Sequence, residues 1–459
     1  MAKPGKEKGF ILITILILML LVAVTAMSLN FKSGLQVEMA VNQSADAQTY
    51  FGQLAAIEQS LWKLTGDPSW RVSAGEDYAY QGRTYNRKVF SHDAVTYPAL
   101  TSYKDAVIIS IRAPNASRPV NTSFRYNIDT VAGTGLSSPQ GMATYYDTAK
   151  KKLFLYIADS GNHCIKKLDT STNVIDLVAG TLGLPSPRGV APYYDAVQKN
   201  LFLYIADSEN HRIWKLDTVT NAIATIAGTG VATEPAVSPV DNILAVNTTL
   251  NSPADIAVDA LGNVYIADTG NDRIRKVTVA TGVITTIAGG FIGTGETNPD
   301  PTKMQLVSPS GVFVDTAGNI YIADTGKHKI RMISATTGAI RLVAGTGTDN
   351  FSGDGGAATA AQLNSPQRIS VDGVGNIYIA DTKNHRLRLV NIHDSTISTM
   401  AGTGTGGYDG DLQPAVQAQL NFPGGVALGL QKAGGRIFIS DTGNNRVRVL
   451  FLKTVKQVY

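Results

Sequence analysis

Short runs of alternating apolar and polar residues, separated by turn residues, recur throughout residues 126–459. The third repeat shows them most clearly: SPADIAVD, VYIAD, RIRKVTV and ITTIAG follow one another, with turns that carry glycine or asparagine between them. Runs of this length, rich in β-branched and aromatic residues, are typical of β-strands. Each repeat therefore predicts four short strands joined by tight turns.

One motif, of which YIADTGNDRIRKV is an example, occurs six times and marks the repeats. Its shared aspartate recurs at intervals of 48 to 61 residues, at Asp159, Asp207, Asp268, Asp324, Asp381 and Asp441. A period of about 40–60 residues built from short strands is typical of propeller blades. Because one blade cannot bury its apolar face alone, we expect the six units to stack into a closed ring.

The two ends of the repeat region predict how this ring closes. The last repeat stops after RVRVLFL, without the VAGTG-type run that completes the others, and such a run precedes the first repeat in residues 126–135. We expect residues 127–132 to form the outer strand of the sixth blade, because joining the ends removes two open sheet edges. The ring then spans residues 126–459.

These repeats resemble the NHL-repeat family, whose members form six-bladed β-propellers. A loop similar to that of bacterial members is present as FSGDGGAATAAQLNSPQ in residues 351–367. The resemblance implies an all-β propeller fold. It leaves the function open, because members include RNA binders, extracellular sensor domains and amidating lyases.

A long apolar segment precedes the repeats. Residues 1–9 contain three lysines, and residues 10–29 carry no charge. At 1.5 Å per residue, a helix of this length crosses a bilayer core of about 30 Å. The basic flank predicts a cytoplasmic N-terminus with the remainder outside. The run is long for a secretory signal peptide and lacks an A-x-A-like end, whereas a plain signal anchor stays an alternative.

Helical spacing continues beyond this segment. Leu54, Ile57, Leu61 and Leu64 lie three or four residues apart, which predicts one helix over residues 10–64. Such a helix resembles the N-terminus of type IV pilins, and the EMA-N pattern of residues 38–42 resembles PilX-like minor pilins. The resemblance implies prepilin peptidase cleavage after Gly9 and N-methylation of Phe10. It implies other minor pilins and the pilus assembly machinery as partners.

Thr14 departs from the pilin pattern, since most pilins carry glutamate at that position. The family's carboxylate is thought to pair with the N-terminal amine of a neighbouring subunit. A subunit without it suits a filament tip, and equally suits a protein that never polymerises. Between helix and ring, the alternating runs of residues 65–125 predict a small antiparallel sheet.

Composition excludes some partners and sites. The net charge of +4 is spread through the repeats, so no nucleic-acid partner is expected. Cys164 is the only cysteine, which excludes an intramolecular disulfide and leaves an incidental thiol. No Ser-His-Asp set, P-loop or H-E-x-x-H motif is present.

Four histidines occupy one slot of the repeat, namely His163, His211, His328 and His385, with Asp272 and Asn445 in the other two. Symmetry spreads this slot around a ring, whereas zinc ligands gather about 2 Å from one ion. We therefore interpret the residues of this slot as turn residues. The repeated aspartates are interpreted as acceptors for turn amides, and no cofactor is expected. Calcium is an alternative at the acidic loops of residues 349–354 and 408–411, although neither has regular EF-hand spacing.

Topology points to one face of the ring for binding. The turn between the second and third strands and the link to the next blade emerge on the same side, and long loops on a rigid ring commonly bind ligands. The candidate binding residues on this face are Asn162, His163, Asn210, His211, Asn271, Asp272, Lys327, His328, Asn384 and His385.

Together these features predict a non-catalytic, minor-pilin-like protein of a type IV pilus or related secretion system. It would be held in the bacterial inner membrane by a single pass, and would display a propeller that binds a surface, glycan or protein at the cell surface or filament tip. The alternative is a signal-anchored sensor or scaffold. A propeller lyase would need polar residues converging on the channel, and the first-strand runs, such as GVFVD and GVALG, are mostly small and apolar.

Overall fold

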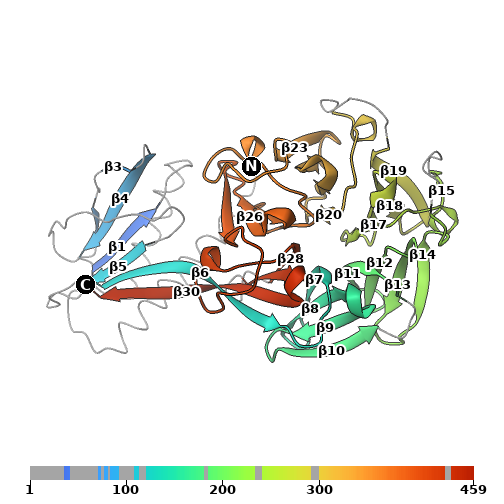
Figure 1. The fold of residues 1–459 in the computed structure, drawn as a ribbon, viewed down its shortest axis with the longest axis horizontal. Helices are drawn as coiled ribbons and strands as arrows, with labels where there is room; N and C mark the ends of the chain where they lie inside the picture. The colour runs from blue at the N-terminus through green and yellow to red at the C-terminus, as the bar shows by residue number, and fades with distance from the viewer. Residues whose placement is uncertain are drawn as a thin grey trace, which may run out of the picture. The chain divides into compact units, whose positions relative to one another are not determined.

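The computed structural model describes residues 126–451, with gaps at 180–183, 233–239, 291–298 and 430–435, and the backbone of several strands outside that range. Contacts divide the chain into two units: Tyr126–Phe451, and a second unit of Met1–Arg125 with Leu452–Tyr459. The larger unit is a ring of six sheets around a central axis (Figure 1).

Each blade of the ring is an antiparallel sheet, and in the first five blades the four main strands follow one another in sequence from the axis to the rim. The first blade consists of β7 (Pro139–Asp147), β8 (Lys152–Asp159), β9 (Cys164–Asp169) and β10 (Val174–Ala179). The second consists of β11 (Pro187–Asp195), β12 (Asn200–Asp207), β13 (Arg212–Asp217) and β14 (Ile223–Ala227). The third consists of β16 (Asp255–Val258), β17 (Val264–Asp268), β18 (Arg273–Thr278) and β19 (Val283–Gly289), with β15 (Ile243–Leu244) added at the rim. The fourth blade consists of β20 (Gly311–Val314), β21 (Ile320–Asp324), β22 (Lys329–Ile333) and β23 (Ile340–Ala344). The fifth consists of β24 (Ile369–Val371), β25 (Ile377–Asp381), β26 (Arg386–Val390) and β27 (Ile397–Ala401). The sixth consists of β28 (Pro423–Leu428), β29 (Ile437–Asp441), β30 (Arg446–Val458) and β6 (Val120–Ala132).

The sixth blade combines the two ends of the repeat region. Strand β6, which precedes all other blade strands in the sequence, pairs with β30 as the outermost strand. Ile128 is fully buried, its backbone N–H donates to Gln413 O at 3.1 Å, and its carbonyl accepts from Leu412 N at 2.7 Å. Residues 127–132 therefore occupy the ring-closing position that the repeat pattern requires.

The apolar core lies between blades rather than inside any single one. Six clusters of buried side chains are found among the described residues, and each joins two neighbouring blades. At the seam between the sixth and first blades, for example, Phe438 and Val447 pack with Leu155 and Ile157. Because side chains alternate across a pleated sheet, each blade presents one apolar face to each neighbour.

A hydrogen bond from each blade to the next reinforces this stacking. The residue after the repeated aspartate is serine or threonine, and its hydroxyl donates to the carbonyl of the proline that precedes or begins the next blade. The donors Ser160, Ser208, Thr269, Thr325, Thr382 and Thr442 are bonded to Pro187, Pro253, Pro309, Pro366, Pro423 and Pro139, respectively. The last pair crosses the seam at 2.6 Å, so the cycle is closed.

The second unit contains strands β1 (Gln36–Val41), β2 (Arg71–Ser73), β3 (Asp77–Tyr80), β4 (Arg83–Ser91) and β5 (Ile108–Arg112). They pair antiparallel in the order β2–β4–β1–β5, with β3 beside β4, and β5 pairs with the first residues of β6.

Strand β1 corrects the predicted helix of residues 10–64 at residues 36–41. There the sequence QVEMAV begins with alternating polar and apolar residues, and its valines favour extended backbone. The rest of that predicted helix, including residues 10–29, lies outside the described residues. Within the described part of the chain, no helix is both long and apolar enough to cross a bilayer.

Candidate functional site

The predicted binding-face residues lie at the short turns between the second and third strands of the blades, which are 3-10 turns in every blade but the second. In η3 (Thr269–Asn271), the Asn271 amide donates to Asp268 Oδ2 at 2.8 Å, and Asp268 Oδ1 accepts the backbone N–H of Asn251 at 2.7 Å. Asn162, Asn210, Asn384 and Asn444 bond their own aspartates in the same way. The repeated aspartate thus fixes its turn to the link before its blade.

Four of the six repeated aspartates are buried beside arginines. Each of these arginines lies seven residues after its aspartate, is almost completely buried and forms an ion pair with it. They are Arg275, Arg331, Arg388 and Arg448. Burial raises the pKa of Asp268 and of Asp381 to about 6, against the opposing effect of their hydrogen bonds and arginines. The arrangement is a structural support for the ring.

The histidine slot joins consecutive blades. His211, His328 and His385 accept a backbone N–H from Ser252, Ser365 and Phe422 at 3.0–3.1 Å through Nδ1. Asp272 and Asn445 accept from Ser308 and Ser138 in the same way. An accepting Nδ1 requires neutral imidazole with its proton on Nε2.

His163 is the exception in this slot. Its Nδ1 lies against the carbonyl of Pro185, so here the ring donates. The link into the second blade is one residue shorter: Ser186 binds the repeated Asp207 and is followed at once by Pro187, which has no N–H. The predicted face residues therefore hold blades to one another, and their role in binding stays a prediction.

The acidic loops considered for calcium are tied to the buried arginines. Asp354 and Asp411 form ion pairs with Arg388 and Arg448 at 2.8 and 2.6 Å. In each loop an aromatic ring covers the same arginine, Phe351 over Arg388 and Tyr408 over Arg448. Among the described residues, no three His, Cys, Asp or Glu side chains are grouped as metal ligands.

A polar cavity opens where the first strands meet around the axis. It measures about 210 Å³ and is lined by Gln140, Arg188, Ala254, Ser310, Gln367 and Arg368. Five of these follow the proline at the start of their blades, so each of five blades contributes one such residue. Ser310 Oγ lies 2.5 Å from Thr325 Oγ1 in η5 (Thr325–Lys327), which places the cavity at the ring face that carries the 3-10 turns and links.

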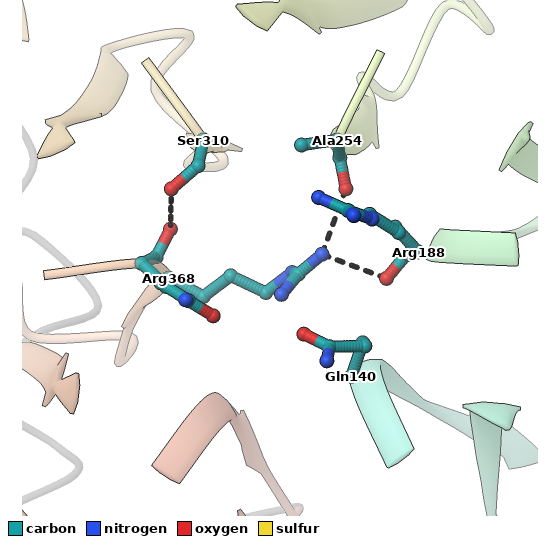
Figure 2. A pocket seen from close by; sticks show the side chains of 6 residues that line it. Gln140, Arg188, Ala254, Ser310 and Arg368 are labelled. Carbon is teal, nitrogen blue, oxygen red and sulfur yellow. Dashed lines mark hydrogen bonds between the residues drawn. The ribbon is translucent and has the colours of Figure 1, made fainter. Parts of the chain in front are cut away.

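Arg368 spans the channel beneath this cavity. From the fifth blade its guanidinium donates to the carbonyls of Arg188 and Ala254, both at 2.7 Å (Figure 2), and to the carbonyl of Gly424 at 3.0 Å. Its Nε donates to Asp255 Oδ1 at 3.3 Å. Arg368 is only 5% exposed, so it forms the floor of the cavity and connects four blades.

Asp255 completes this floor. Its Oδ2 accepts the backbone N–H of Val312 at 3.1 Å. Burial raises the pKa of Asp255, and the neighbouring Arg368 acts in the opposite direction. The pair brings one negative and one positive charge into the middle of the ring.

Asp255 and Arg368 are the exceptions among the first-strand positions, which the sequence shows to be mostly small and apolar. At the equivalent position the other four blades carry glycine: Gly141, Gly189, Gly311 and Gly425. A Cβ at Gly141 would lie 2.5 Å from Arg188 O and 3.1 Å from Arg368 Nε. The signal in the sequence was the Asp of DIAVD and the Arg of RISVD at a position otherwise reserved for glycine.

Arg188 differs from Arg368 in being accessible. It is exposed at the mouth of the cavity, its side chain reaches toward the centre (Figure 2), and its guanidinium makes no hydrogen bond to any described residue. Partial burial lowers the pKa of Arg188, as does repulsion from Arg368, while Glu209 has the opposite effect. An arginine pKa starts so high that the group stays charged.

Two family models match the ring sequence. The Teneurin NHL domain model matches residues 129–305, and the NHL repeat model matches residues 363–388. The chain is 31% identical over 213 residues to "Protein SUPPRESSOR OF QUENCHING 1, chloroplastic" of Arabidopsis thaliana. This match covers 44% of this chain and 20% of the plant protein. It is 26% identical over 332 residues to human NHL repeat-containing protein 2, covering 69% of this chain and 39% of that protein.

Solved structures share the fold. An auxiliary nutrient binding protein from Bacteroides thetaiotaomicron superposes with a TM-score of 0.52 at 16% identity, over 84% of this chain and 90% of the other. The ring is thus an NHL repeat domain folded as a six-bladed β-propeller. The matched parts make up about a fifth and two fifths of the two curated relatives, so the relatives' full activities do not transfer to this chain.

Proposed function

We propose that this protein is a non-catalytic binding protein whose propeller takes its ligand at the channel mouth. The observation that carries this proposal is the free Arg188 guanidinium in a cavity built by five blades. The surrounding ring is held by inter-blade hydrogen bonds, so the lining residues are fixed before a ligand arrives. A preorganised, concave site with a few polar groups is typical of ligand binding.

The lining favours binding over catalysis. Neither histidine nor cysteine is among its residues. The one hydroxyl, that of Ser310, is bonded to Gln367 O at 3.1 Å and to Thr325. A nucleophile needs an adjacent general base, which this lining lacks.

The propeller is presented outside the membrane, in this proposal, by the N-terminal segment. The apolar run of residues 10–29 and the Gly9-Phe10 junction after a basic leader support a minor-pilin-like anchor. Mass spectrometry of the protein extracted from membranes tests this part. A mature chain that begins with methylated Phe10 is expected, and a chain that retains Met1 contradicts the pilin-like processing.

The binding role has a separate test. The full chain in detergent is screened against neutral and charged glycans and against cell-surface extracts, with Gln140→Ala and Gln367→Ala variants in parallel. Saturable binding that both variants weaken supports the channel mouth as the site. Binding that neither variant changes places the ligand elsewhere on the protein.

A further inference from the structure

We infer that the channel mouth binds a small ligand through a single carboxylate, which the Arg188 guanidinium receives beside the amides of Gln140 and Gln367. Acidic sugars carry such a group. This inference rests on the proposed function, because it names the ligand chemistry of the same site.

The two arginines of the cavity have different tasks. Arg368 uses four of its five N–H donors on three backbone carbonyls and on Asp255, so its charge is paired and most of its hydrogen-bonding capacity is occupied. Arg188 has no hydrogen-bond partner among the described residues and lies in the open part of the cavity. The recognition of an anion therefore falls to Arg188, and Arg368 acts as a positioning residue.

The charge at the mouth favours a monoanion over a phosphate. Arg368 and Asp255 offset each other, which leaves the charge of Arg188, and the nearby carboxylate of Glu209 opposes a second negative charge. One guanidinium presents a planar fork that matches one carboxylate with two parallel hydrogen bonds. A phosphate dianion would need further cations that this mouth does not supply.

The remaining lining groups fit hydroxyls. A Cβ on Gly424 would lie 3.2 Å from Gln140 Oε1 and 3.5 Å from Gln367 Oε1, so the two amides approach the same point of the mouth. An amide both donates and accepts, as a hydroxyl does. The volume of about 210 Å³ lies below the roughly 300–1,000 Å³ of drug-sized pockets, which indicates a ligand of one sugar ring or less.

Isothermal titration calorimetry of the full chain in detergent tests this inference, with galacturonate, neutral galactose and inorganic phosphate as probes. We expect galacturonate to bind at least about tenfold more tightly than either of the others. Arg188→Gln is expected to weaken galacturonate about tenfold or more, as loss of a charge-assisted pair does. Arg188→Lys keeps the positive charge without the planar guanidinium, so its affinity for galacturonate is expected to lie between those of the natural chain and Arg188→Gln.

The matched control is Arg341→Gln, which removes an exposed arginine from rim strand β23 and is expected to leave galacturonate affinity unchanged. Galacturonate affinity that is unaffected by Arg188→Gln overturns the inference, as does equal affinity for phosphate. Binding of galactose alone also overturns the inference, but it leaves the propeller a binding module and so spares the proposed function.

Discussion

Single residues, above all Asp255 and Arg368, determine the polarity of the propeller's channel. Four blades place glycine where two others place Asp255 and Arg368, and the missing side chains leave room for one guanidinium to reach carbonyls of three other blades. A buried ion pair is weak evidence for stability by itself, but removing one partner leaves the other charge unpaired. The pair therefore makes the ring sensitive to substitution at its centre.

We expect Arg368→Met to lower the free energy of unfolding by about 3–5 kcal/mol. The substitution leaves the Asp255 carboxylate in the channel without its cationic partner and removes the donors for three carbonyls. Chemical denaturation measures the loss. Asp255→Asn combined with Arg368→Met is expected to be more stable than Arg368→Met alone, and equal stability of the two would show that the charge of Asp255 is not the cause.

The histidine slot predicts a pH dependence. Burial lowers the pKa of His328 and His385 below their ordinary value near 6.5. The unfolded chain therefore binds more protons below pH 6.5, so stability falls as the pH drops through 6.5 toward the folded pKa values. Protonation of either imidazole also puts a hydrogen on Nδ1, which then faces the backbone N–H that Nδ1 accepts in the neutral form.

His328→Asn with His385→Asn tests this dependence, because Asn445 already makes the same contact in the sixth blade. We expect similar stability at pH 8 and a smaller loss between pH 7 and 5 than in the natural chain. The raised pKa of Asp268 and Asp381 acts in the opposite direction in both proteins, so the difference reports on the histidines. His393→Asn, outside the slot, is the control; identical profiles for all three proteins would refute the prediction.

Among the elements, the links before the first strands of blades five and six act as clamps on the ring. Each provides an aromatic ring over an arginine pair, Phe351 over Arg386 and Arg388 and Tyr408 over Arg446 and Arg448. Each also provides an aspartate to the deeper arginine. These glycine-rich acidic loops thus satisfy a buried charge.

Because Asp354 and Asp411 already have cationic partners, we expect added calcium or EDTA to leave the melting temperature unchanged. Asp354→Ala is expected to lower the free energy of unfolding by about 1–3 kcal/mol, since it removes a partner of the fully buried Arg388. Thermal denaturation with and without calcium measures both effects. A calcium-dependent rise in melting temperature that Asp354→Ala abolishes would instead identify a calcium site.

The whole ring depends on the seam between its first and last strands. Residues 127–132 reach the sixth blade from the opposite end of the repeat region, and the hydrogen bond from Thr442 to Pro139 joins this blade to the first. A closed ring leaves no inner edge to fray. Its stability therefore depends on a strand that lies far in the sequence from the other strands of its blade.

A chain that begins at residue 123 is expected to fold as a soluble ring, and one that begins at residue 137 is expected to aggregate or to melt many degrees lower. The shorter chain loses the buried Ile128 and the partly buried Val131. Two such side chains contribute roughly 3–6 kcal/mol, a large share of the about 5–15 kcal/mol of a typical domain. Equal melting temperatures for the two chains would show that the seam strand is dispensable.

The sequence alone determined the ring. Strand periodicity, turn residues and a six-fold motif are local features, so the number of blades, their order and the need for residues 127–132 could be predicted from the repeats. The same local reasoning predicted a helix over residues 36–41, where the structure has β1. There the helical spacing of neighbouring residues masked a short alternating run.

Only the tertiary structure decided the character of the channel. Asp255 and Arg368 are 113 residues apart, and each reads as one polar residue in an apolar strand. The ring brings them together because equivalent positions of different blades converge on one axis. The same convergence sets Arg188 above a neutralised floor, which is why the candidate site depends on differences between repeats, whereas the fold depends on their similarity.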